Sequence, residues 1–138
     1  MGNFSYQLSD AYLVLNKRNC DTLHLGTGSG LYCLINIGDN NHDGKDEIAF
    51  VVDNCDFSSL NSCNIYTICR NKWTELKSFG VNEFAFDYTT NEEPVFNEIP
   101  GFLEKHNGQW MFKDYYQEFF DTIEGNTKFA KLKLYKCK

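Results

Sequence analysis

The chain has little basic charge and no long apolar run. Its 138 residues carry 13 lysines and arginines against 19 aspartates and glutamates, for a formal net charge of -6. A phosphate backbone is bound by a basic patch, so we do not expect a nucleic acid as partner. No run of apolar residues is long enough to span a bilayer, so we expect no transmembrane segment.

Catalytic signatures are also scarce. The three histidines are isolated from one another in the sequence: His24, His42 and His106. The adjacent acids Glu92 and Glu93 do not point at one substrate atom, as the acid pair of a glycosidase does. The glycine-rich stretch 26–30 precedes an expected strand rather than a helix, so it predicts a turn and not a phosphate-binding loop. We therefore expect that the protein is not an enzyme.

The six cysteines form no Cys-x-x-Cys pair and have no histidine at zinc-finger spacing. Disulfides are the better interpretation, and they place the protein in the periplasm or outside the cell. The first residues lack the features of a signal peptide, so we expect that such a signal has been removed. Among the many possible pairings we predict one, Cys55 with Cys63, because the polar segment between them suggests a loop joining two strands. Buried free thiols are the alternative for some cysteines.

Length and a hydrophobic content of 42% predict one domain, residues 1–138, with a real core. Runs of β-branched and aromatic residues between polar turns predict a mainly β fold of antiparallel hairpins. Turns are expected at 70–72 and at Asn107-Gly108. At most one or two short helices are expected, and 114–123 is compatible with either helix or strand. Residues 129–135 predict an edge strand whose lysines face solvent.

The most informative stretch is residues 38–48. The apolar runs before and after it, 31–37 and 48–52, are typical of strands. An EF-hand would have helices on both sides and a glutamate at the twelfth loop position, where this chain has Phe50. The polar stretch therefore predicts a loop that joins two strands.

Oxygen-bearing side chains recur through this loop. Asp39, Asn41 and Asp43 fall at alternate positions, which suits Ca²⁺, a cation that takes about six to eight oxygen ligands. The glycine after Asp43 permits a sharp bend that turns the Lys45 carbonyl inward, and Glu47 can return a carboxylate from the far side. We predict one Ca²⁺ ion bound by these five residues. A polar turn without metal is the alternative.

The pattern Asp-x-Asn-x-Asp-Gly-x-x-acid, followed by an apolar strand, resembles the calcium loop of the FG-GAP and VCBS repeat families. The resemblance covers about one tenth of the chain and implies a Ca²⁺ site between two strands. It departs at the last ligand, where Glu47 replaces the usual aspartate. The motif occurs once, and a propeller needs several blades, so we do not expect that architecture.

Charge and aromatic residues are unevenly distributed. Residues 81–124 hold ten acids and two lysines, net -8, with eleven of the 22 aromatics, whereas 128–138 hold five lysines and no acid. Aromatic anchors in an acidic surround are typical of an interface for a basic protein. The alternative is an aromatic core under a solvated acidic face. The expected partner-binding residues are Glu92, Glu93, Trp110, Asp114, Tyr115, Tyr116 and Glu118.

These features together favour a binding protein. In overall plan the chain is similar to the periplasmic immunity proteins of Gram-negative bacteria, which act against secreted antibacterial toxins. That similarity implies that it binds and occludes a cognate toxin, a basic protein domain. The alternative is a calcium-stabilised cell-surface adhesion or glycan-binding module. A neighbouring toxin gene would favour the first, and a place within a larger surface protein the second.

Overall fold

The structure, a computed structural model, describes residues 9–13, 23–28, 31–52, 60–82, 85–86, 96–115 and 128–136. These residues form nine β-strands and no helical element, which confirms the mainly β class. No helix among them is long and apolar enough to cross a membrane. Residues 116–123, for which helix and strand were both open, lie outside the described residues.

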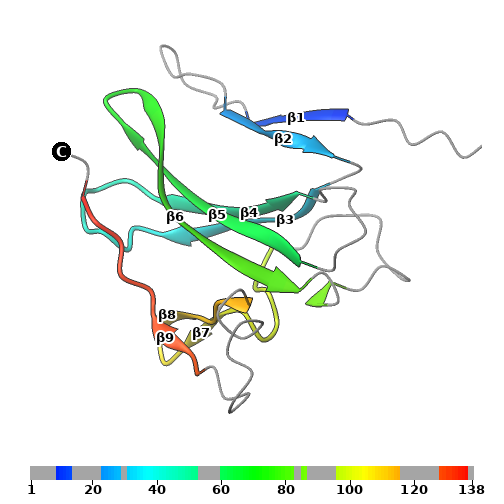
Figure 1. Cartoon of the computed structure of the whole chain (residues 1–138). Helices are drawn as coiled ribbons and strands as arrows, with labels where there is room; N and C mark the ends of the chain where they lie inside the picture. Colours follow the sequence, from blue (N-terminus) through cyan, green and yellow to red (C-terminus); the bar gives the residue numbers. More distant parts are fainter. Residues whose placement is uncertain are drawn as a thin grey trace, which may run out of the picture.

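The strands form three antiparallel sheets (Figure 1). The four-stranded sheet has the order β3 (Leu31–Gly38), β4 (Glu47–Val52), β5 (Leu60–Cys69) and β6 (Lys72–Asn82). The three-stranded sheet has the order β7 (Leu103–His106), β8 (Gln109–Phe112) and β9 (Ala130–Lys131). The third sheet pairs β1 (Ser9–Leu13) with β2 (Leu23–Gly28). Figure 1 shows the four-stranded sheet between the other two.

Two tight hairpin turns set the register. Arg70 and Asn71, between β5 and β6, have φ of 50° and 66°, and Asn107 and Gly108, between β7 and β8, have 52° and 78°. Positive φ at both central residues defines the turn type whose twist matches that of the two strands, and asparagine and glycine adopt it most readily. Both predicted hairpins are confirmed. The predicted turn at 26–30 is wrong in part, because β2 continues to Gly28.

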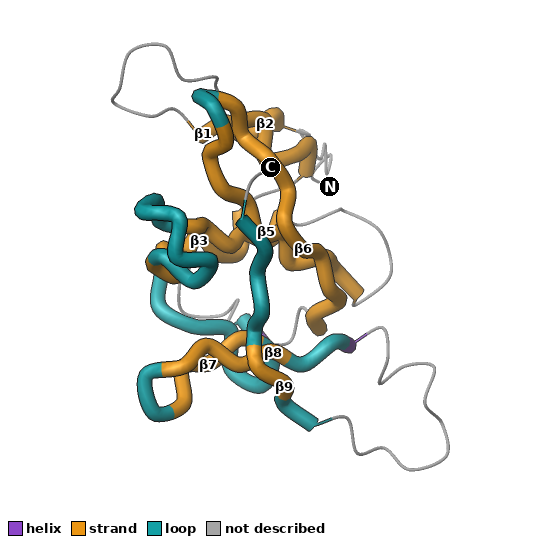
Figure 2. Tube along the Cα trace, turned by 90° about the vertical axis from the view of Figure 1, so that its left-hand side faces the viewer, coloured by secondary structure: helices purple, strands orange, loops and turns teal. Residues whose placement is uncertain are grey.

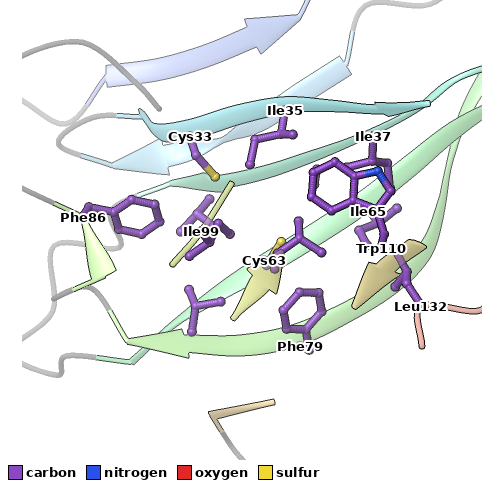
Figure 3. Packing of buried hydrophobic residues seen from close by; sticks show 14 residues of the cluster. Cys33, Ile35, Ile37, Cys63, Ile65, Phe79, Phe86, Ile99, Trp110 and Leu132 are labelled. Atoms are coloured by element: carbon purple, nitrogen blue, oxygen red, sulfur yellow. The ribbon is translucent and has the colours of Figure 1, made fainter. Parts of the chain in front are cut away.

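The main core lies between the four-stranded and three-stranded sheets (Figure 3). Alternate residues of β3 face it, namely Cys33, Ile35 and Ile37, because side chains of a strand alternate between its two faces. Trp110 of β8 packs in the same cluster and is only 7% exposed. Its predicted role as an exposed anchor for a partner is therefore wrong. The indole adds its large apolar surface to the core instead.

Two cysteines are part of this core. Cys33 and Cys63 both lie opposite Val51, one on each side of it, so they are two strands apart. Two strand spacings separate the Cα atoms of the two cysteines by about 10 Å, which is too far for a disulfide. Cys33 and Cys63 are both buried free thiols. The predicted Cys55–Cys63 bridge is wrong, because Cys63 lies within β5 and faces the core rather than a loop. Cys69, at the end of β5, is disulfide-bonded.

The thiols can be mapped by alkylation. We expect Cys33 and Cys63 to stay unmodified in the folded protein and to be alkylated once it is denatured, even when no reductant is added. Cys69 should be alkylated only after a reductant has broken its disulfide. Burial raises the pKa of Cys33 to about 12 and that of Cys63 well above its ordinary value, which leaves little reactive thiolate in the folded state. Peptide mapping by mass spectrometry measures each site. Alkylation of Cys33 and Cys63 as fast in the native as in the denatured protein would contradict their burial.

The C-terminal segment, residues 128–136, crosses the ends of the four-stranded sheet (Figures 1 and 2). Leu132 is buried, and its amide donates to the Trp110 carbonyl at 2.9 Å. The strand predicted over 129–135 is shorter in the structure, where only Ala130–Lys131 pair as β9. Lys131 and Lys133, on either side of Leu132, are exposed, which confirms that these lysines face solvent. Leu132 and Leu134, two alternate residues of the segment, therefore cover one end of the core.

Candidate metal centre

The predicted calcium loop joins β3 to β4 at the end of the sheet that the C-terminal segment crosses. Register irregularity begins at Gly38, which pairs with Glu47 and has φ of 77°. Within the loop His42 and Gly44 also have positive φ, 60° and 87°. Gly44 adopts this conformation without steric cost, and the chain can therefore turn tightly around its own side chains.

The loop side chains point inward onto the loop backbone. Asp39 accepts hydrogen bonds from the amide of Asp43 at 3.1 Å and from that of Gly44 at 2.8 Å. Asp43 accepts one from the amide of Lys45 at 2.9 Å, and the Asn41 side-chain oxygen accepts one from the Asp43 amide at 3.3 Å. An oxygen that accepts one N–H keeps a further lone pair, so these bonds leave capacity for a cation.

Glu47 is fully buried at the base of the loop. Its Oε1 accepts from the amides of Asn40 at 3.1 Å and Asn41 at 2.9 Å, whereas Oε2 has no hydrogen-bond partner. Burial raises the pKa of this carboxyl to about 7; those two amides oppose the rise, and the carboxylates of Asp39 and Asp43 add to it. A buried oxygen without a partner is costly, and a cation held there would satisfy it.

The donor set fits a hard cation. Among the described residues, no three histidine, cysteine, aspartate or glutamate side chains gather as a ready-made metal cluster. Calcium sites also use amide and backbone carbonyl oxygens and water, so Asn41 and the Lys45 carbonyl would complete a set begun by Asp39, Asp43 and Glu47. Hydrogen bonds within the loop bring together the four predicted ligands that carry side-chain oxygens: Asp39, Asn41, Asp43 and Glu47.

Two contacts connect the loop to distant parts of the chain. The side-chain amide of Asn41, a buried residue, donates to the Tyr135 carbonyl at 3.0 Å and to Asp43 at 3.2 Å. The ammonium of Lys45 donates to the Ile68 carbonyl near the end of β5 at 3.3 Å. The loop therefore holds both the C-terminal segment and the β5–β6 hairpin. No sequence signal predicts the contact between Asn41 and Tyr135, because it joins residues 94 positions apart.

A pocket of about 380 Å³ lies between the loop and the C-terminal segment. It is lined by Asp39, Asn40 and His42 on the loop and by Gly108, Gln109, Lys131, Leu132 and Lys133 opposite. This opening brings solvent to the Asp39 side of the loop. A hydrated cation would have access to the proposed site from here.

Of the seven predicted partner-binding residues, the structure describes three, and one of them is the buried Trp110. Asp114 accepts a hydrogen bond from the Gly80 amide at 2.9 Å, and the Tyr115 ring packs edge-on against Phe102 at 5.9 Å. Both residues are half-buried, so they attach the end of β8 to its neighbours. The remaining four lie outside the described residues: Glu92, Glu93, Tyr116 and Glu118.

Comparison with known proteins adds no relative. No protein-family model matches this chain, and no match was found among curated proteins or among solved structures. The similarity to FG-GAP and VCBS calcium loops therefore rests on the sequence motif alone.

Proposed function

We propose that this protein is a non-catalytic, exported binding protein that carries one structural Ca²⁺ ion in the loop from Asp39 to Glu47. The observation that supports the metal best is the buried Glu47 Oε2, which lacks a partner and lies near the Asp39 and Asp43 carboxylates. When bound, the ion supplies positive charge that offsets these acids. Hydrogen bonds from the backbone amides of the loop hold the carboxylates of Asp39, Asp43 and Glu47 in an inward orientation.

The contacts of the loop support a structural role for the metal. Asn41 binds the Tyr135 carbonyl, and Lys45 binds the Ile68 carbonyl. Both bonds depend on the conformation of the loop, and a metal that fixes this conformation would also fix the two segments. Loss of the ion is expected to loosen the C-terminal segment first, because that segment has only two residues in a strand.

For the partner, we propose a basic toxin domain that the protein binds and occludes as an immunity protein. The net charge of -8 in residues 81–124 supports a basic partner, because opposite charge steers the encounter. Described acids of this segment are fixed in place: Glu98 accepts from the Lys105 amide, and Glu104 from the Gly101 amide and His106. Phe96 in the same segment is 58% exposed and would supply an apolar anchor.

Charge reversal tests the partner face. Once a partner is isolated by co-purification from the periplasm, Glu92→Lys with Glu93→Lys should slow its association about tenfold at low salt. The effect should fade as ionic strength rises, because salt screens exposed charges. Stopped-flow or surface-plasmon kinetics measure the rate.

The matched control reverses Lys131 and Lys133 to glutamate, which changes charge by the same amount in the opposite direction. This control variant should associate with the partner no more slowly than the wild type does. If the lysine variant weakens binding and the glutamate variant does not, the toxin-binding face lies on the C-terminal segment and the assignment to residues 81–124 is wrong.

A further inference from the structure

A second surface has the opposite charge. A groove of about 550 Å³ runs between β6 and the C-terminal segment, which lie side by side in Figure 2. It is lined by Lys77, Phe112, Ala130, Lys131, Lys133 and Tyr135. Among the described residues that line the groove there are three lysines and no acidic side chain.

The three lysines of the groove differ in how their charges are held. The Lys77 ammonium lies 4.3 Å from the centre of the Phe112 ring, and this cation–π contact holds the charge at the wall of the groove. Lys131 and Lys133 are exposed on the C-terminal segment. In the described part of the chain none of the three forms an ion pair with a carboxylate. Their charge is available to a ligand.

The spacing of the groove residues indicates the shape of that ligand. Lys131, Lys133 and Tyr135 are exposed, while Leu132 between them is buried and Leu134 half-buried. Alternate residues of an extended segment are about 7 Å apart. An extended peptide with acids at alternate positions has the same period, so successive carboxylates meet both lysines. Tyr135, 81% exposed, adds an aromatic surface at the end of the row.

We propose that this groove binds an extended acidic segment of a partner protein, with carboxylates at alternate positions against Lys131 and Lys133. Lysines often protect a sheet edge, and β6 and β9 are both edge strands of their sheets, but that role does not account for the exposed Tyr135. Long polyanions are disfavoured, since three lysines must act against a chain of net charge -6. The proposal does not depend on the toxin partner, which would bind a different, acidic segment.

Fluorescence anisotropy of a short labelled peptide, in which glutamate and threonine alternate, tests the proposal with the full chain at low salt. We expect saturable binding that Lys131→Gln with Lys133→Gln weakens about tenfold. Tyr135→Ala should weaken it as well. The matched control is Lys72→Gln with Lys105→Gln, two exposed lysines outside the groove, which should bind as the wild type does. These exposed positions leave the thermal melt unchanged, so a loss of binding is not a loss of fold.

A second peptide of the same composition, with its glutamates in one block, tests the spacing and should bind more weakly. No binding by the wild type would overturn the proposal, and so would an equal loss in the control variant. Equal affinity for the two peptides would refute the alternate spacing. Tight binding of a sulfated polysaccharide through Lys131 and Lys133, with none of the peptide, would assign the groove to a glycan instead.

Discussion

Thermal unfolding in excess calcium should occur about 10 °C above thermal unfolding in a chelator. A ligand that binds only the folded state stabilises it by about 2.7 kcal/mol when present at about a hundred times its Kd. For a domain of this size, each kcal/mol raises Tm by about 3 to 5 °C. Asp43→Ala should abolish the difference between the two melts, because it removes a proposed ligand.

Asp46→Ala is the matched control for this experiment. Asp46 carries the same charge, lies in the same loop and is exposed, and its carboxylate accepts a hydrogen bond from the Asn36 side chain at 3.2 Å. It is not among the proposed ligands, so the calcium response should persist in this variant. Identical melts of the wild type with and without calcium would show that calcium does not stabilise the fold.

Replacing Trp110 by alanine should destabilise the protein by about 3 to 5 kcal/mol, because the change leaves a cavity where the buried ring packs. Trp110→Phe fills part of that space and should cost less, which provides a variant that still folds. Phe96→Ala, at a side chain that is 58% exposed, should change stability by only about 0.5 kcal/mol. Urea denaturation measures all three. A Trp110→Ala variant as stable as Phe96→Ala would place the indole outside the core.

Local signals predicted two hairpin turns and the strands on either side of the calcium loop. The Asn-Gly pair at 107–108 and the turn at Arg70-Asn71 dictate their hairpins, because few residues accept positive φ. The apolar runs on either side of the calcium loop became β3 and β4 as expected. In contrast, β2 has glycines at Gly26 and Gly28 and lacked a strand signal, since glycine contributes no side chain to a sheet.

Local sequence signals do not predict which side chains are buried or which distant residues are in contact. Whether Trp110 faces the core depends on how β8 packs against the four-stranded sheet, and tryptophan occurs both in cores and at interfaces. Likewise the free thiol of Cys63 follows from its position across Val51 from Cys33, a register that no local pattern sets. In the calcium loop, the sequence indicated the oxygen-bearing side chains that the structure brings together, but not the bond from Asn41 to the C-terminal segment.

Calorimetric titration of calcium into chelator-treated protein tests the metal site most directly. One Ca²⁺ should bind per chain in the wild type and in Asp46→Ala. None should bind to Asp43→Ala, and binding should be much weaker in Glu47→Gln, which keeps the size of the side chain but loses its charge. Absence of binding by the folded wild type at millimolar calcium, or undiminished binding by Asp43→Ala, would contradict a calcium site in this loop.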